Sequence, residues 1–270
     1  MSATMAMPGP ATRTPTRTPT RTVLVRTAAA EWSRMWSVRS SWTFTLVTAL
    51  VVVGFGAIIG AQTNPSSVDA GSTAWDGARL TSMFALFGIL TLSVLTTTAD
   101  HVTGGIVPTL QWTPRRPVLL AARACVVVAT TTVLGVVLVA GAGLAVWLFL
   151  PQLGLPVGDG GRTLAEMGFV FASGSVLAVG LGLLTRSTAG GLVSVIGLVL
   201  VLPFLMAQLP YDWAVTTAAH LPGSGALFLI FGEGPSDDMT EASSRITLVV
   251  WAVAALIAGG GRLLRADANR

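Results

Sequence analysis

Lysine is absent from this chain of 270 residues, because all sixteen of its basic side chains are arginine. A P-loop needs a lysine that reaches the nucleotide phosphates, and a Schiff-base enzyme needs a lysine amine. The sequence therefore excludes both kinds of chemistry. We expect the chain not to be an enzyme and to carry no cofactor of its own.

Cysteine and histidine are almost as scarce. Cys125 is the single cysteine, so the chain can form no internal disulfide bond, and we expect this thiol to be a small buried hydrophobic group. The two histidines, His101 and His220, lie far apart without the spacing of metal ligands. The sequence therefore predicts no metal site.

Charged residues of any kind make up only 10% of the chain, whereas 52% are hydrophobic and the mean hydropathy is +0.74. This composition is typical of a membrane protein, in which about 20 apolar residues form one membrane-crossing helix. The sequence predicts an all-α polytopic membrane protein with six transmembrane helices. The expected spans are Trp42–Ala61, Leu80–Ala99, Val118–Leu150, Met167–Thr185, Thr188–Leu209 and Ile246–Leu264.

The arginines are distributed unequally between the two sides that six spans define. Three of them, Arg79, Arg162 and Arg245, fall on one side, and the other thirteen fall on the side that holds both termini. The positive-inside rule then places both termini on the cytoplasmic side of the membrane, which we expect to be a bacterial plasma membrane. Because the arginines flank apolar spans and form no continuous basic face, we expect no nucleic-acid partner. The thirteen are Arg13, Arg17, Arg21, Arg26, Arg34, Arg39, Arg115, Arg116, Arg123, Arg186, Arg262, Arg265 and Arg270.

The regions outside the spans differ in composition. Residues 1–22 contain a TRTP repeat with nothing apolar to bury, which predicts a disordered tail. The spans fill residues 42–264 and include a cytoplasmic loop at 100–117, and residues 265–270 form a cytoplasmic tail. The external loop 210–244 begins with a rather apolar stretch, for which we expect short re-entrant or surface helices.

Residues 23–41 are expected to form an amphipathic elbow helix at the membrane interface. Val25, Ala28, Trp32 and Met35 recur at helical spacing, and a span follows closely. The tryptophan rings suit the headgroup level, where arginine side chains can snorkel towards water. The interfacial residues of this elbow are Trp32, Arg34, Trp36 and Arg39.

The interiors of the predicted spans carry almost no ionisable side chain. Arg123 and Arg262 lie near span ends, from which we expect both to snorkel. A proton-coupled transporter normally needs carboxylates or histidines at membrane depth, so a secondary transporter is disfavoured. Gly56 and Gly60 form a G-x-x-x-G pattern that predicts close helix packing.

Three stretches together resemble the membrane subunit, or permease, of a type-2 ATP-binding-cassette (ABC) exporter. "AAAEWSRMWSVRSSWTF" is similar to the elbow helix of that family, and "LLTRSTAGGLVSVIGLVLVLP" is similar to its short turn between spans four and five. "ADHVTGGIVPTLQWTPRRPVLLAARA" resembles its loop between spans two and three. The resemblance covers about residues 28 to 264, although this chain has Asp-His where the family often has Glu and an aromatic, and Arg123 where it has Lys.

The resemblance implies a permease that moves a substrate outward across the cell membrane. The apolar spans suggest that this substrate is lipophilic. A separate ABC ATPase subunit would bind ATP and Mg²⁺, and a second permease subunit would complete a homo- or heterodimer among membrane lipids. The loop between spans two and three would be the coupling helix that docks on the ATPase; Arg186 and Ser187 would form a second cytoplasmic turn. The coupling loop comprises Asp100, His101, Gly104, Gly105, Trp112, Pro114, Arg115, Arg116 and Arg123.

The residues of this loop suit docking on their own chemistry. Gly104 and Gly105 permit a sharp turn, Trp112 can fill a pocket, and Arg115 and Arg116 can pair with carboxylates of a partner. The simpler alternative is a positive anchor at a span boundary, which explains the arginines but not Trp112 or the glycine pair. A non-transporting membrane immunity or sensor protein remains the alternative for the whole chain.

Overall fold

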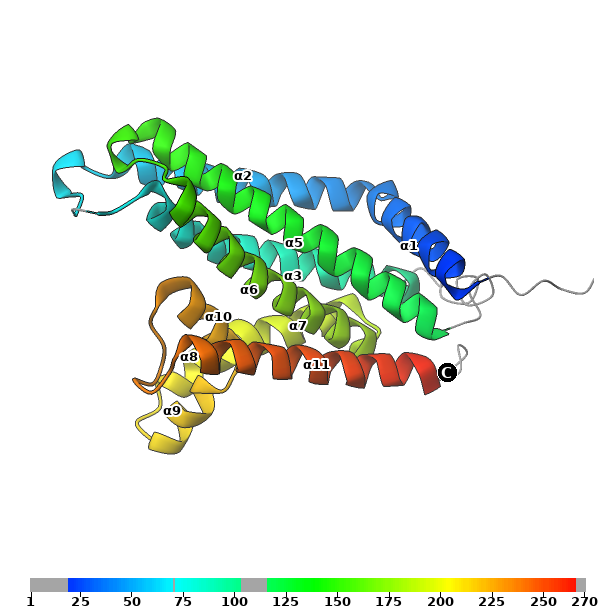
Figure 1. The fold of residues 1–270 in the computed structure, drawn as a ribbon. Helices are drawn as coiled ribbons and strands as arrows, with labels where there is room; N and C mark the ends of the chain where they lie inside the picture. Colours follow the sequence, from blue (N-terminus) through cyan, green and yellow to red (C-terminus); the bar gives the residue numbers. More distant parts are fainter. Residues whose placement is uncertain (1–18, 70, 103–115, 266–270) are drawn as a thin grey trace, which may run out of the picture.

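The computed structural model describes residues 19–69, 71–102 and 116–265, and all regular secondary structure in this part of the chain is helical, without β-strands. Within these residues, six helices or broken helices are long and apolar enough to cross a membrane, and a bent pair of short helices in the last loop could form a seventh span. The six run roughly along one direction, as Figure 1 shows. The prediction of an all-α polytopic membrane protein is therefore confirmed. The six are α2 (Arg39–Gln62), α3 (Ala74–Val102), α5 (Arg116–Phe149), α6 (Val157–Thr185), the segment Thr188–Ala207, and α11 (Glu241–Arg265).

Three of these helices begin at least five residues earlier than the apolar pattern predicted, because a polar first turn precedes the apolar residues. Asp76, Asp159 and Glu241 stand in the first turns of α3, α6 and α11. A carboxylate near a helix N-terminus interacts favourably with the helix dipole, so these turns stay helical beyond the apolar segment. Hydrophobicity alone marks only the part of a helix that lies in hydrocarbon.

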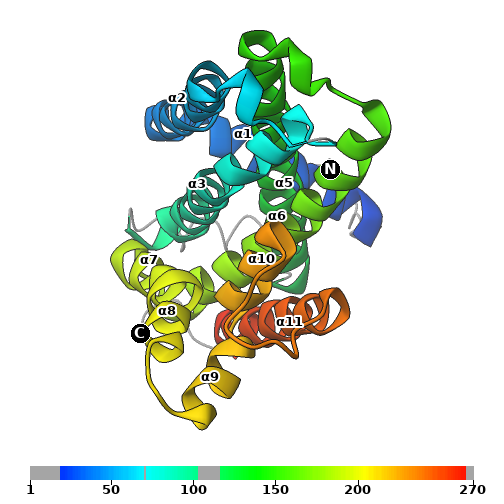
Figure 2. The same cartoon turned by 90° about the vertical axis from the view of Figure 1, so that its left-hand side faces the viewer.

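The centre of the bundle is formed by α3 and α6. In their most apolar windows 61% and 72% of residues are buried, against 22% in α2. Figure 2 looks at the bundle from the end opposite to α1 and shows α2 and α11 on opposite sides, with α3 and α6 between them. The outward faces of α2 and α11 remain free of contacts within the chain and suit a lipid environment.

Small residues bring neighbouring helices close together. A Cβ atom added at Gly56 would lie 2.7 Å from the Ala142 carbonyl oxygen, and one added at Gly60 would lie 2.7 Å from that of Val146. The G-x-x-x-G pattern therefore packs α2 against α5, which confirms the predicted close packing and places it within one chain. A similar approach joins α6 to α11 at Gly180 and Gly259, where an added Cβ at Gly259 would lie 2.1 Å from the Gly180 carbonyl oxygen.

The fifth span is irregular, and helices of the last loop pack on it. It consists of α7 (Thr188–Ile196), a π-helical turn η3 (Gly197–Val201) and α8 (Leu202–Ala207). The last long loop contains α9 (Asp212–Ala219) and α10 (Pro222–Phe231), which are bent by 73° relative to each other. Most residues of α10 are buried. The expected short helices in this loop are therefore present.

The elbow is α1 (Thr20–Ser37), which lies at the same end of the bundle as the C-terminal end of α11 (Figure 1). We call this the arginine-rich end. It also holds the last turns of α3 and α6 and the first turns of α2, α5 and α7. The short 3₁₀ turns η1 (Pro65–Ser67) and η2 (Pro151–Leu153) belong to the opposite end.

Candidate functional site: an ion-pair ring at the elbow

Four charged side chains meet where α1, α3 and α5 contact one another at the arginine-rich end. Glu31 and Arg34 come from the elbow, Asp100 from the last turns of α3, and Arg123 from the third turn of α5. Each arginine contacts both carboxylates, so the four side chains form a closed arginine–carboxylate ring. The ring contains two positive and two negative charges and is neutral overall.

The geometry of the ring is that of charge-assisted hydrogen bonds. Arg123 donates from Nε to Glu31 Oε2 at 3.1 Å and from Nη2 to Glu31 Oε1 at 3.0 Å. Its Nη2 also donates to Asp100 Oδ2 at 2.5 Å. Arg34 donates from Nη2 to Glu31 Oε2 at 2.6 Å, and its Nη1 pairs with Asp100 Oδ1. Such bidentate pairs fix geometry more tightly than single point-charge contacts.

Arg123 is fully buried, which corrects the expectation that it snorkels to water. Its side chain is 0% exposed, whereas that of Arg34 is 29% exposed. A buried guanidinium is tolerated only when carboxylates satisfy it, and here two of them do. The Nη1 atom of Arg123 is buried without a hydrogen-bond partner. The elbow helix supplies one of the two carboxylates, so removing α1 would leave Arg123 with Asp100 alone.

The position of the ring along the membrane normal follows from helix geometry. Asp100 lies 21 residues after Arg79 on α3, a rise of about 32 Å at 1.5 Å per residue. This distance matches the hydrocarbon thickness of about 30 Å, and Arg79 belongs to a second charged cluster at the opposite end. The ring therefore lies at one boundary of the hydrocarbon layer, and the α5 residues before Arg123 extend beyond it.

The second cluster has Glu166 at its centre. Glu166 pairs with Arg79 at 3.2 Å and with Arg245 at 3.7 Å, so it connects α3, α6 and α11. The sequence predicted only that Arg79 and Arg245 lie on the opposite side of the membrane, and it gave no sign that they share Glu166 as a partner. The two clusters hold α3 at both boundaries of the apolar layer.

The predicted coupling loop begins and ends beside the ring. Asp100 is two residues before the end of α3, and Arg123 is seven residues after Arg116, the first residue of α5. His101 belongs to the last turn of α3. The structure thus brings Asp100 and Arg123 together, although sequence analysis assigned them only to opposite ends of the loop. The other predicted loop residues, Gly104, Gly105, Trp112, Pro114 and Arg115, lie outside the described residues.

Arginines also connect helix ends at this end of the molecule. Arg116 Nη1 lies 3.4 Å from the Leu263 carbonyl oxygen, so the start of α5 contacts the end of α11. Arg186 donates to the Arg262 carbonyl oxygen at 3.2 Å, and Arg262 donates to that of Leu184. Cationic side chains suit the carbonyl-rich C-terminus of a helix.

The predicted second turn lies between α6 and α7. Arg186 has a left-handed backbone conformation with φ of 54° and ends α6, and Ser187 caps α7 by accepting a hydrogen bond from the Gly190 N–H at 3.3 Å. Burial and the neighbouring Arg262 guanidinium lower the pKa of Arg186 from its ordinary value. This turn lies at the same end as the ring and both ends of the predicted coupling loop.

The elbow presents different faces to the bundle and to its surroundings. Thr27, Glu31 and Met35 are buried against the bundle, while Trp32 is 56% exposed and faces outward. At the corner between α1 and α2, Trp42 Nε1 donates to the Trp36 carbonyl oxygen at 2.9 Å. Trp32 is thus exposed on the side away from the bundle, whereas the face that contacts the bundle contains the Glu31 carboxylate.

Two further results concern residues singled out by their scarcity. Cys125 is exposed on the outer side of α5, so the expectation of a buried thiol was wrong. In a span, a hydrophobic residue can face lipid as well as a protein core, and sequence does not distinguish these environments. Residues 19–69, 71–102 and 116–265 contain no group of three or more His, Cys, Asp or Glu side chains placed to hold a metal ion.

Glu31 is the functional candidate that sequence analysis missed. An available signal was its charge: only three of the twelve acids, Glu31, Asp100 and Asp267, fall on the side with thirteen arginines. Two of those three, Glu31 and Asp100, supply the carboxylates of the ring.

A comparison with models of known protein families finds no match, and a search of curated proteins finds no similar sequence.

Proposed function

We propose that this chain is the membrane-spanning permease subunit of an ABC exporter, whose ATP is hydrolysed by a separate subunit. The proposal includes a second permease subunit and a cytoplasmic location for the arginine-rich end. The resemblance of the elbow, the loop 100–117 and the turn at Arg186 supports it. The observation that supports it most is the ring, because it connects the elbow to both ends of the loop that would dock on the ATPase.

The ring suits the transmission of force from that loop. A force on the loop would reach α3 near Asp100 and α5 near Arg116, and the ring makes these two helix ends and the elbow move together. A positive anchor would need only exposed arginines, because snorkelling alone places them at the boundary. A fully buried Arg123 with two carboxylates goes beyond this requirement.

The distribution of charge supports an external energy source. Between the two boundary clusters, the spans contain no Asp, Glu, His, Lys or Arg from residue 80 to 99, 124 to 149, 167 to 185 or 188 to 207. A proton relay needs such groups at membrane depth. The ring itself is neutral, hydrogen-bonded and at a boundary, so it suits a structural role better than proton transfer.

The decisive test is a charge reversal in the loop. Arg115→Glu combined with Arg116→Glu should abolish ATP-driven transport or complex formation, because like charges across an interface cost several kcal/mol. Arg116 also contacts the end of α11, so Arg116→Gln alone is the control for that internal contact. Transport is measured in vesicles that contain the chain together with the ATPase subunit that copurifies with it.

A second variant separates coupling from charge. Gly104→Val should reduce coupling without altering charge, because valine has less conformational freedom than glycine. Full ATP-driven transport by both the reversed and the Gly104 variants, after correct insertion, would make the loop an anchor. If the wild-type chain supports no ATP-dependent transport at all, that result favours the alternative of a non-transporting immunity or sensor protein.

A further inference from the structure

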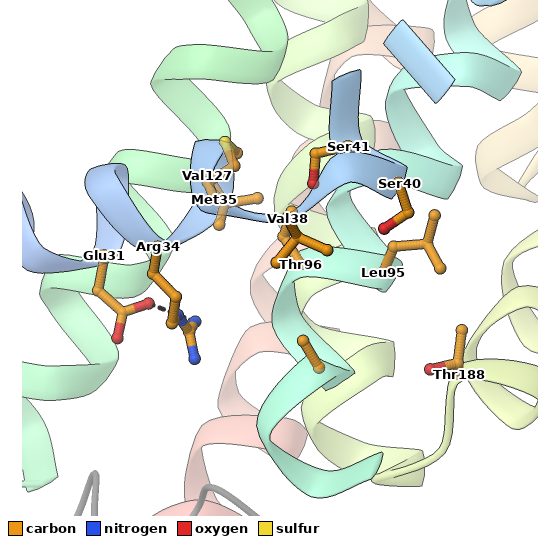
Figure 3. A pocket seen from close by; sticks show the side chains of 11 residues that line it. Glu31, Arg34, Met35, Val38, Ser40, Ser41, Leu95, Thr96, Val127 and Thr188 are labelled. Atoms are coloured by element: carbon orange, nitrogen blue, oxygen red, sulfur yellow. Dashed lines mark hydrogen bonds and ion pairs between the residues drawn. The ribbon is translucent and has the colours of Figure 1, made fainter. Parts of the chain in front are cut away.

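A cavity of about 270 Å³ lies beside the ring, in the corner between the elbow and the second helix. Figure 3 shows its lining, which comes from α1, the start of α2, the last turns of α3, and the starts of α5 and α7. We call it the elbow cavity. It lies at the hydrocarbon boundary, because Glu31 and Arg34 of the ring form part of its wall.

The wall of the elbow cavity is divided between apolar and polar groups. Met35, Leu95 and Val127 supply an apolar surface, while Arg34, Ser40 and Ser41 supply cationic and hydroxyl groups. The Glu31 carboxylate also lines the cavity, and its charge is offset by the two arginines of the ring. This division matches an amphipathic ligand. A purely apolar chain would leave the serines unpaired, and a free ion would leave the apolar wall uncovered.

Ser41 points to a missing polar partner. The residue is 7% exposed and lines the cavity, and within the described part of the chain its hydroxyl makes no hydrogen bond. It stands in the first turn of α2, whose N-cap residue Val38 provides no side-chain cap. The Ser41 N–H already donates to the Val38 carbonyl oxygen, but the positive end of the dipole of this 24-residue helix still favours an anion at its first turn.

Arg39 adds a positive charge beside the elbow cavity, although its side chain is not part of the lining. It is the first residue of α2, between the lining residues Val38 and Ser40, and it is exposed. Among residues 19–69, 71–102 and 116–265 no carboxylate pairs with it. Arg34, which also lines the cavity, is half-buried, and two of its nitrogens pair with the carboxylates of the ring.

We propose that the elbow cavity binds an anionic membrane phospholipid. Its phosphate accepts hydrogen bonds from Ser40, Ser41 and Arg39 at the start of α2, and its glycerol and upper acyl segment cover Met35, Leu95 and Val127. The level of the cavity agrees with this occupant, because phosphates lie just outside the hydrocarbon layer. The proposal does not depend on export and applies to any function of the chain.

Native mass spectrometry of the purified, delipidated full-length chain tests the proposal. The probes are dioleoyl-phosphatidylglycerol, dioleoyl-phosphatidylcholine and inorganic phosphate. The chain should bind phosphatidylglycerol more tightly than phosphatidylcholine. Arg39→Gln should reduce this preference about five-fold, the typical contribution of one arginine near an anionic membrane surface.

Ser41→Leu should weaken phosphatidylglycerol binding by a similar factor, because leucine removes the hydroxyl and fills part of the cavity. The matched controls are Thr43→Leu on the outward side of α2 and Arg162→Gln on an exposed arginine of the opposite end. Both controls should bind as the wild type does. Arg39→Gln changes only an exposed side chain, so it stays informative if Ser41→Leu lowers the melting temperature.

The proposal is overturned if Arg39→Gln leaves the preference for phosphatidylglycerol unchanged, or if the two lipids bind equally well to the wild type. It is also overturned if millimolar inorganic phosphate displaces the lipid completely, because the site would then bind a soluble anion. A wild-type preference that falls in Arg39→Gln and persists in both controls supports the lipid site.

Discussion

Arg123 has no exposed surface, so its charge depends on Glu31 and Asp100. Arg34 makes similar contacts but retains access to water. The two arginines share both carboxylate partners but differ in burial. This difference in burial decides which substitutions the ring tolerates.

We expect Arg123→Gln to lower the free energy of unfolding by about 3–5 kcal/mol, because it leaves buried carboxylates without their partner. Arg34→Gln should cost less, since water can replace part of its contact. Thermal or denaturant unfolding of the purified chain in detergent measures both effects, with Arg162→Gln as the exposed control.

A double-mutant cycle tests whether Arg123 and Glu31 act as a pair. The cost of Arg123→Gln combined with Glu31→Gln should be smaller than the sum of the single costs by about 1 kcal/mol or more. Strict additivity would show that the two side chains do not interact in solution.

At the level of elements, glycines control how closely the helices approach. Gly259 faces the Gly180 carbonyl oxygen of α6, whereas nothing lies within 4 Å of the Cβ position of Gly261, two residues later on the same helix. One helix thus contains a glycine required by packing and another that packing does not require.

Gly259→Ala should force α11 away from α6 and lower the melting temperature. Gly261→Ala should be neutral or stabilising by up to about 1 kcal/mol, because alanine favours a helix more than glycine does. The comparison is made by thermal unfolding of the two variants. A smaller loss for Gly259→Ala than for Gly261→Ala would contradict the close helix contact.

At the scale of the whole molecule, the orientation of the bundle in the membrane can be tested by cysteine labelling, because only one native cysteine has to be replaced first. Cys125 faces outward from α5, so Cys125→Ser should preserve folding. In that background, a cysteine at Asp237 should react with a membrane-impermeant reagent in intact cells, and one at Ala189 should not. The reverse labelling pattern would place the arginine-rich end outside the cell.

The energy source gives a second test at this scale. The chain lacks lysine, so we expect the purified protein to hydrolyse no ATP and an ATPase subunit to copurify with it in mild detergent. ATP hydrolysis that persists after every other ATPase has been removed would contradict the proposal that a separate subunit hydrolyses ATP.

Sequence was sufficient for the six spans because hydrocarbon thickness imposes a minimum apolar length on each. It located the close contact at Gly56 and Gly60, since the small-residue pattern is local. It did not locate the ring, because Glu31, Asp100 and Arg123 come from three separate parts of the chain. A single charge near a span end permits either snorkelling or a buried pair, and only the arrangement of α1, α3 and α5 decides between them.

The ring also constrains how the protein is made. Glu31 precedes Arg123 by 92 residues, which corresponds to roughly 5 to 20 s of synthesis on the ribosome. During this interval the elbow has no Arg123 with which to pair, so it remains at the membrane surface until the third span has been inserted. Asp100 and Arg123 reach the elbow only if spans two and three enter in opposite directions. Closure of the ring therefore follows insertion of the third span and stabilises only chains whose first three spans have inserted correctly.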